Sequence, residues 1–466
     1  MNVKQYIAMQ SMPVILLILF LLVNGLALLY GSTFLRPASD DYCFGSNVAA
    51  HGIFGGVYQW WMTWAAFLYA KFLGNLFVGA PLVYLPLSLA SAIPFFIALF
   101  GAGIVAYAFY PEKPQEKSGK IIFILLAAFF WWTFLWGDKA FGLQRTTFSR
   151  FAEGLTHWQT LNSTYITAAL ILFLIFAWIL QQPDRSRPLF KIVAVFCGIA
   201  AGLAGSAVSL GYLGFSLIAL GYDVFKKRPS QFPIINTDRN LWVLFCLALV
   251  VSVLLSHTLS PGYAIRRELI NPDTTMSFVR LFELMVFTFK GVVRFLVRTY
   301  ISLPAFFLIL AITSFSSVFT KIYPIQAVSH SRLVLTSASF FLLSLAMAGA
   351  ARTSQFFIGG SAYWHFSVAT LCAYFALLFA GIALGFFIRS QPKYTKRIRT
   401  TCFLIMIFFT WTNFVAIGAI LEREVRWRVG PAPTHNVSDI NFVGFQRCFD
   451  VLNKHWAVPI IRDSCY

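Results

Sequence analysis

Two adjacent aspartates, Asp40 and Asp41, follow the first long apolar run of the chain, which ends at Tyr30. Acidic residues are scarce in this sequence, with 17 Asp and Glu against 36 Lys and Arg. Two neighbouring carboxyl groups cannot both ionise cheaply when they are partly desolvated, so one of them becomes suited to taking a proton from a substrate. A solvated Asp-Asp turn after Pro37 is the competing interpretation.

Two adjacent arginines, Arg266 and Arg267, are the strongest candidates for binding a phosphate. They follow a Pro-Gly turn, and exposed backbone N–H groups together with forked guanidiniums suit phosphate oxygens. Anchorage of the pair to lipid headgroups is the alternative. Two later cations, Arg352 and His365, could neutralise the same phosphate. His365 follows Trp364, however, and also fits an ordinary aromatic belt at a membrane interface.

A third set of residues has the chemistry to bind a sugar. His157 and Trp158 come shortly before Tyr165 at the start of an apolar run, and Tyr42 lies next to the aspartates. Aromatic faces stack on the C–H surfaces of sugar rings, so these side chains are candidates for contacts with a donor or acceptor sugar. A plain belt of interfacial aromatic residues is the alternative interpretation.

The composition places these residues in a membrane protein. The chain is 59% hydrophobic and 11% charged, whereas soluble domains are roughly 25% charged. The net charge of +19 comes from bases in short loops between apolar runs, which favours membrane lipids or a phosphorylated ligand over nucleic acid as partners. The sequence contains no HExxH, GxSxG, Walker or CxxC motif, so hydrolase, nucleotide-dependent and structural-zinc functions have no support.

Apolar runs of about twenty residues predict an all-α polytopic protein with about 11 transmembrane helices. Residues 31–78 are expected to form a first outer loop with interfacial helices. The basic segment 278–300 is expected to form another interfacial helix, and the glycine-rich pair within 191–222 a tight hairpin. The expected spans are 12–30, 79–110 (one long span broken near Pro94), 121–136, 162–181, 191–205, 208–222, 240–259, 301–320, 333–349, 366–388 and 401–421.

The distribution of charge predicts how the chain is oriented. The loops richest in Lys and Arg fall on one side, which the positive-inside rule makes cytoplasmic together with the amino terminus. Residues 1–421 then form the transmembrane module, and 422–466 form an outer tail. Asp138, Glu283 and Lys290, the few ionisable residues near membrane depth, are expected at the surface.

The cysteines carry no metal-binding spacing. Cys197, Cys246, Cys372 and Cys402 fall within apolar runs and are expected to be buried. Cys448 and Cys465 lie in the outer tail, where we expect them to form a disulfide.

The order of three short motifs resembles that of the GT-C fold glycosyltransferases that depend on a polyprenyl-phosphate-linked sugar. The likeness is to the bacterial multi-span group of serotype-converting glucosyltransferases and arabinofuranosyltransferase-like enzymes. It covers residues 39 to 267. The motifs are Ser39-Asp40-Asp41-Tyr42-Cys43, His157-Trp158-Gln159-Thr160 with Tyr165, and Ser260-Pro261-Gly262-Tyr263-Ala264-Ile265-Arg266-Arg267.

The resemblance implies transfer of a sugar from a polyprenyl-phosphate donor to an acceptor hydroxyl at the outer face of the bacterial inner membrane. The acceptor would be a glycan, such as a lipopolysaccharide or another cell-envelope glycan, or a protein. Asp40 or Asp41 would act as general base, and the arginines would stabilise the lipid-phosphate leaving group. No cofactor and no metal ligands are expected, although an aspartate pair is also compatible with a divalent cation.

Two other functions are consistent with the layout. A polysaccharide polymerase or ligase would use a pyrophosphate-linked donor, but such enzymes rely on a large late outer loop, which is short here. A transporter of lipid-linked sugars would favour ionisable residues within the spans, and few are present.

Overall fold

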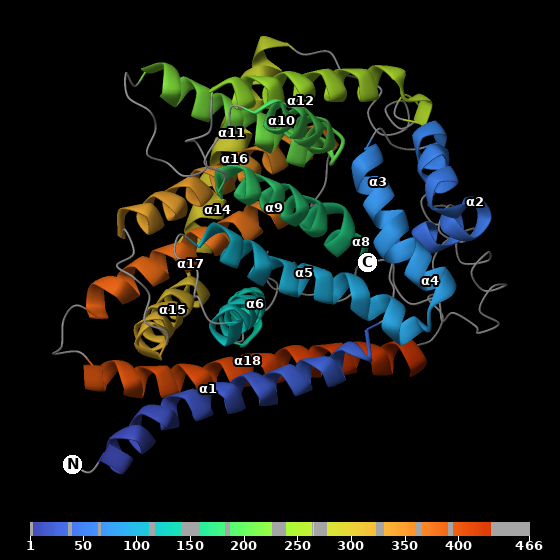
Figure 1. Ribbon diagram of the computed structural model, residues 1–466. Helices are drawn as coiled ribbons and strands as arrows, with labels where there is room; N and C mark the ends of the chain where they lie inside the picture. Colours follow the sequence, from blue (N-terminus) through green and yellow to red (C-terminus); the bar gives the residue numbers. More distant parts are fainter. Residues whose placement is uncertain are drawn as a thin grey trace.

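The computed structural model describes residues 3–35, 40–63, 67–110, 117–140, 159–181, 187–225, 239–262, 264, 277–322, 330–358, 366–389 and 395–429. Within these ranges the regular structure is entirely helical (Figure 1). In chain order the elements are α1 (Val3–Ser32), α2 (Asp40–Thr63), α3 (Leu68–Gly74), η1 (Asn75–Gly79), α4 (Ala80–Tyr84), α5 (Leu87–Phe109), α6 (Lys117–Ala140), α8 (Gln159–Leu161), η2 (Asn162–Thr167), α9 (Ala168–Gln181), α10 (Pro188–Gly202), α11 (Ser206–Phe225), α12 (Arg239–Leu259), α14 (Phe278–Tyr300), α15 (Leu303–Ile322), α16 (His330–Ile358), α17 (Ser367–Arg389) and α18 (Thr395–Val429).

Seven of the described helices are long and apolar enough to cross a membrane. An eighth span results if α14 and α15, which meet at a bend of 48°, are counted as one. Three other expected spans correspond to the shorter apolar segments Ile18–Ser32, Pro188–Gly202 and Ala207–Ile218. The class of all-α polytopic membrane protein is thus confirmed, and the count of about eleven spans stays a prediction. The last helix, α18, continues past 421 to Val429.

The expected long span 79–110 is divided, but not near Pro94. Helix α4 ends at Tyr84, Leu85 is extended (φ −122°, ψ 160°), and α5 begins after Pro86. A proline disfavours helical backbone in the residue before it, which explains the break at this point. Pro94 lies inside α5, which continues through it; neighbouring helices make such prolines tolerable in membrane helices.

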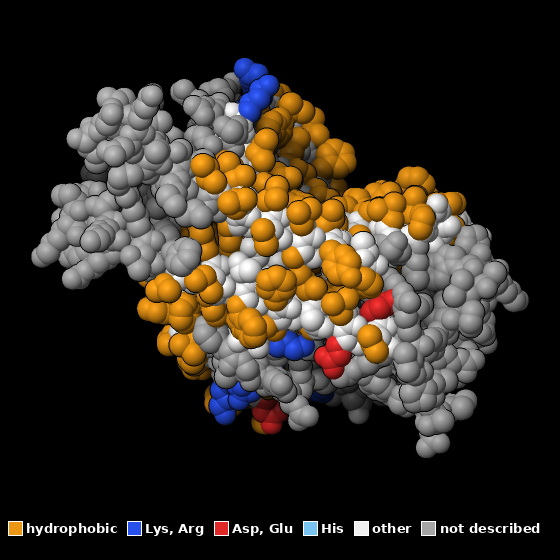
Figure 2. Space-filling view, turned by 90° about the horizontal axis from the view of Figure 1, so that it is seen from below, with side chains coloured by type: hydrophobic (Ala, Val, Ile, Leu, Met, Phe, Trp, Pro, Cys, Tyr) orange, Lys and Arg blue, Asp and Glu red, His pale blue; other side chains and the backbone are white. Residues whose placement is uncertain are grey.

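The first-loop helices lie at one end of the molecule. In Figure 1, α1 and α18 run side by side along the bottom, whereas α2 and α3 stand at the right-hand end and run steeply across that direction. Seen from below, hydrophobic side chains cover most of the described surface (Figure 2). Helices α1 and α18 carry exposed apolar side chains, among them Leu22, Leu26, Trp411 and Phe414. Such a surface suits contact with lipid chains.

Helices α6 and α17 form the centre of the core. Trp131, Trp132 and Trp136 of α6 are fully buried, as is Tyr374 of α17. The Tyr374 hydroxyl donates a short hydrogen bond to the Ala127 carbonyl of α6. Because a buried phenol needs a polar partner, this bond fixes the register of the two central helices.

A buried polar network joins α1, α6 and α18. The indole Nε1 of Trp132 donates to Asn413 Oδ1 at 3.0 Å, and Asn413 Nδ2 donates to Asn24 Oδ1 at 3.1 Å. Asn24 in turn donates to Thr410 Oγ1 at 3.2 Å. Hydrogen bonds of this kind hold helices together in lipid, where apolar packing gives little preference between partners.

The glycine-rich pair α10 and α11 does not form the expected tight hairpin. Gly198 and Gly202 of α10 instead face α12: a Cβ atom at either position would collide with the Phe245 carbonyl or with Ser252. Gly211 of α11 packs in the same way against Met347 of α16. Small residues allow the backbones of two helices to come close together. The sequence does not indicate, however, which helix packs against these glycines.

Asp138 was expected at the surface and is buried, with an exposed fraction of 6%. Helix α6 runs to Ala140, beyond the expected end at 136. Gly137 leaves no room for a side chain next to Pro304, so α15 packs tightly on this end of α6. Glu283 and Lys290 are exposed, as expected.

Helix α14 coincides with the expected amphipathic segment 278–300. It has three faces: one packed against α16, one apolar and exposed, and one cationic and exposed. Three such faces suit a helix that lies between protein, lipid and water. The buried residues are Gly291, Phe295 and Thr299; the exposed apolar ones include Phe278, Phe282, Met285, Phe289 and Val293; the exposed cations are Lys290, Arg294 and Arg298.

Candidate functional site

The structure brings Asp41 of the first motif together with Thr160 of the second. One carboxylate oxygen, Asp41 Oδ1, accepts hydrogen bonds of 2.6 Å from both the backbone N–H and the hydroxyl of Thr160. Asp41 is fully buried, and Thr160 exposes only 4% of its surface. Thr160 lies in the first turn of the helix that continues as η2 and α9, where backbone N–H groups lack partners within the helix. Asp41 therefore holds the start of α2 against the start of this second helix.

A kink in α2 shapes the first loop. Gly52 adopts φ 69° and ψ −179°, a conformation that only glycine reaches readily. The two halves of α2 fold toward each other across this residue. The Asn47 amide donates to the Gly56 carbonyl at 2.8 Å, and the rings of Phe44 and Trp60 lie 5.2 Å apart.

A lysine of the next helix, α3, lies against the two folded halves of α2. The Lys71 ammonium of α3 is 4.0 Å from the ring centroid of Trp60 and 4.8 Å from that of Phe44. Each distance is within the range of a cation–π interaction. Since Phe44 is one turn after Asp41 on α2, the site combines a buried carboxylate, a cation and aromatic faces.

The third motif begins against the end of the first loop. Ser260 donates to the Trp61 carbonyl at 3.0 Å, and the rings of Phe67 and His257 lie 5.6 Å apart. The first contact joins the end of α12 to the last turn of α2, and the second joins it to the residue before α3. All three motifs therefore meet the first loop through contacts of described residues.

Two π-helical turns flank the site, and each begins with a fully buried asparagine, Asn75 in η1 and Asn162 in η2. Asn75 Nδ2 donates to the Ile53 carbonyl at 2.9 Å, while its Oδ1 has no hydrogen-bond partner among the described residues. Single π turns widen a helix and recur at functional sites. Sequence reasoning missed Lys71 and Asn75, and the sequence signals neither contact, because both depend on how α2 and α3 pack.

Two predicted site residues besides Asp41 have described side chains. Tyr165 lies in η2 and is partly buried against the main core. Arg352 lies near the end of α16 and contacts α14: its guanidinium carbon is 3.8 Å from the ring centroid of Phe287, and its Nη1 donates to Gln355 Oε1 at 2.7 Å. Whether Arg352 shares a phosphate with Arg266 and Arg267 stays a prediction.

The remaining predicted residues lie outside the part of the chain whose side chains are described. They are Asp40, Tyr42, His157, Trp158, Arg266, Arg267, His365, Cys448 and Cys465. Asp40 and Tyr42 do belong to the first turn of α2. Cys197, Cys246 and Cys372 are free and buried, as expected, whereas the side chain of Cys402 lies outside the described part.

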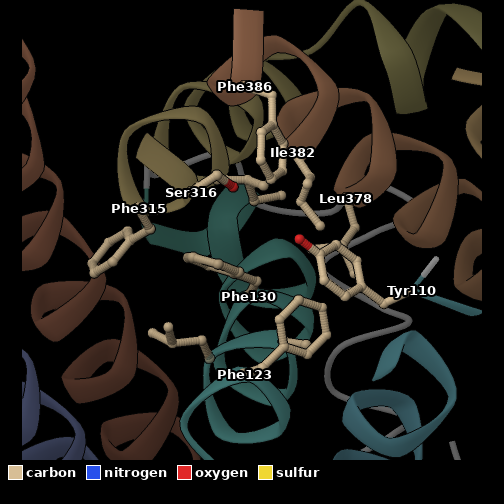
Figure 3. Close-up of a pocket in the computed structure, with 11 residues that line it drawn as sticks. Tyr110, Phe123, Phe130, Phe315, Ser316, Leu378, Ile382 and Phe386 are labelled. Atoms are coloured by element: carbon tan, nitrogen blue, oxygen red, sulfur yellow. The ribbon is translucent and has the colours of Figure 1, made fainter. Parts of the chain in front are cut away.

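A separate apolar pocket lies between α5, α6, α15 and α17 (Figure 3). Its empty volume is about 410 Å³, including space open to the surroundings. Phe123, Phe130, Phe315 and Phe386 line it, and Ser316 and Tyr110 supply its hydroxyls. Such a lining suits a hydrocarbon chain and offers little for group transfer.

Among the described residues no group of three His, Cys, Asp or Glu side chains is arranged to hold a metal ion. No family model matches the chain, and neither a curated protein nor a solved structure resembles it significantly.

Proposed function

We propose that this chain is a membrane glycosyltransferase that transfers a sugar from a polyprenyl-phosphate donor to the hydroxyl of a glycan or protein acceptor. The observation that supports this most is the pairing of distant motifs: Asp41 binds Thr160, and Ser260 binds Trp61. Three segments that are distant in the sequence therefore lie close together. They are the loop with the two aspartates, the aromatic loop, and the turn before Arg266 and Arg267.

The two aspartates have different roles in this proposal. Asp41 Oδ1 already accepts two hydrogen bonds, which occupy both lone pairs of that oxygen. Because Asp41 is also fully buried, an acceptor hydroxyl has no access to it. We therefore assign Asp41 as a positioning residue and Asp40 as the general base.

The reaction is a displacement at the anomeric carbon. The acceptor oxygen forms a bond to that carbon while its proton passes to the Asp40 carboxylate, and the bond from the carbon to the phosphate oxygen breaks. The polyprenyl phosphate leaves with the negative charge, which Arg266 and Arg267 stabilise together with Arg352 and His365. His157, Trp158, Tyr165 and Tyr42 are the proposed contacts for the sugars.

The proposed location is the outer face of a bacterial inner membrane, with the amino terminus in the cytoplasm. The distribution of Lys and Arg over the short loops supports this orientation. In this orientation the folded α2 hairpin, the proposed site of proton transfer, lies in the outer leaflet.

The test is transfer by the purified full-length protein in liposomes. The assay supplies radiolabelled polyprenyl-phosphate-glucose or polyprenyl-phosphate-arabinose with lipopolysaccharide as acceptor, and it measures labelled product and released polyprenyl phosphate. Asp40→Asn is expected to reduce transfer by about 10²-fold or more with unchanged thermal stability, in line with the contribution of a general base. Asp41→Asn is expected to reduce both transfer and stability, since it disturbs the contact with Thr160.

Near-normal transfer by Asp40→Asn would show that Asp40 is not the general base. Movement of the labelled lipid across the bilayer with its sugar still attached would instead identify a transporter.

A further inference from the structure

A pair of guanidiniums between α14 and α16 adds a residue to the proposed donor-phosphate site, to which Arg352 already belongs. Arg352 extends from α16 across Gly291 of α14, so closely that a Cβ atom at Gly291 would collide with the Arg352 side chain. Arg294 is three residues after Gly291 and hence on the neighbouring part of the same helix surface. Two like charges thus converge on one side of α14.

The described contacts of Arg352 leave its charge without an anion. The guanidinium stacks on Phe287 and donates to the neutral Gln355 amide. Its Nε is buried without a hydrogen-bond partner among the described residues. A partly buried cation beside a second cation is unfavourable unless an anion is bound, and forked guanidiniums match the oxygens of a phosphate.

The surface beside the two arginines is apolar. Val297, three residues after Arg294, is exposed beside it on α14, and the exposed Val293 and Phe289 continue this apolar surface around the helix. An anion in this position therefore borders on a surface that suits hydrocarbon. A phosphate attached to a lipid chain satisfies both features at once, whereas inorganic phosphate satisfies only the first.

We infer that Arg294 and Arg352 together bind the phosphate of a membrane lipid whose hydrocarbon chain lies along the exposed apolar face of α14. Because Arg352 is also a proposed donor-phosphate residue, the inference rests in part on the proposed function; lipid binding is measured without sugar transfer, so the two can fail separately. An anionic phospholipid and an isoprenoid phosphate share this chemistry, and the experiment distinguishes them.

The experiment measures lipid binding to the full-length protein in detergent by native mass spectrometry. The probes are dioleoyl-phosphatidylglycerol and geranylgeranyl phosphate; neutral dioleoyl-phosphatidylcholine and geranylgeraniol serve as their uncharged counterparts. Arg294→Gln and Arg352→Gln are each expected to weaken binding of at least one anionic probe by about tenfold or more, as expected for loss of a charge-assisted hydrogen bond. The anionic probe whose binding is weakened shows whether the site takes a phospholipid or an isoprenoid phosphate.

Two matched pairs of variants separate this site from general charge and from misfolding. Lys117→Gln removes one exposed charge from the start of α6, a helix that carries neither arginine, and is expected to leave binding within about twofold of wild type, because exposed charges at a distance contribute little. Gly291→Ala displaces Arg352 and is expected to weaken binding. Gly349→Ala lies in the same helix interface but meets only ordinary contacts of 3.6 and 4.0 Å, and it is expected to have no effect.

Three results would overturn the inference. They are equal loss of binding in Lys117→Gln and Arg294→Gln, unchanged binding of both anionic probes in Arg294→Gln and Gly291→Ala, and equally tight binding of the neutral probes.

Discussion

The hydroxyl of Ser260 donates a hydrogen bond of 3.0 Å to the backbone carbonyl of Trp61, 199 positions earlier in the chain. This bond places the end of α12 against the end of α2. At the other end of the kinked α2, Asp41 binds Thr160. The first loop is thus held at both ends by segments that carry candidate functional residues, and the predictions below test what this arrangement requires.

Replacing Thr160 by valine removes one of the two donors to Asp41 while keeping the backbone N–H. Hydrogen bonds to charged groups contribute about 1.5–3 kcal/mol, so Thr160→Val is expected to lower the free energy of unfolding by about that amount. Thr164→Val is the control, because its hydroxyl makes only a local bond to the Thr160 carbonyl. The stabilities of the two variants are compared by thermal unfolding in detergent. Equal midpoints for Thr160→Val and Thr164→Val would contradict a special role for the Asp41 contact.

Replacing Gly52 by alanine is expected to disrupt the kink of α2. The conformation at φ 69° and ψ −179° costs a residue with a side chain about 1–3 kcal/mol. The variant should therefore open the α2 hairpin and expose it to limited proteolysis. Gly25→Ala in α1, where an added methyl group meets nothing within 4 Å, is expected to behave like wild type. Equal protease resistance of all three proteins would show that the kink does not depend on glycine.

Replacing Asn413 by leucine is expected to destabilise the packing of α1, α6 and α18. The change leaves the Trp132 indole and the Asn24 side chain without their shared partner. Hydrogen bonds between membrane helices contribute about 0.6–2 kcal/mol, which sets the expected loss. Thr412→Val is the matched control, since the Thr412 hydroxyl bonds only to the Phe408 carbonyl of its own helix. A smaller midpoint shift for Asn413→Leu than for Thr412→Val would argue against a stabilising network.

The proposed orientation predicts opposite accessibility at two exposed positions. Tyr58 of α2 is 64% exposed, and Lys117 at the start of α6 is also exposed. In intact spheroplasts a membrane-impermeant maleimide is expected to label Tyr58→Cys and not Lys117→Cys, with labelled peptides identified by mass spectrometry. Labelling of Lys117→Cys should require permeabilisation. The reverse pattern would place the α2 hairpin in the cytoplasm.

Individual elements show how far local sequence information reaches. The bases and apolar residues of 278–300 predicted the amphipathic helix α14 with its observed bounds, because amphipathicity is a property of one segment. The break at Leu85 and Pro86 was missed, since three prolines, Pro81, Pro86 and Pro94, lie in the same apolar run and only Pro86 interrupts the helix. The burial of Asp138 was missed because it depends on the close approach of α15 at Gly137.

The candidate site was predictable in its residue types but not in its geometry. The sequence singled out Asp40-Asp41 and the arginines through rare charges next to apolar runs. It contained no signal for the Thr160 partner of Asp41, for Lys71 between Trp60 and Phe44, or for the convergence of Arg294 on Arg352. Each of these relationships joins side chains from different helices.

The sequence by itself determined that this chain is helical and belongs in a membrane, because the free energy of transferring a segment into lipid depends on its own composition and length. Only the tertiary structure decided that Asp41 is buried and bound to Thr160, and that α10 packs on α12 rather than on α11. In lipid, apolar surface gives little preference between helices, so partners are selected by close backbone contact and hydrogen-bond geometry. Those are properties of pairs of segments, and they are fixed only when the segments are assembled.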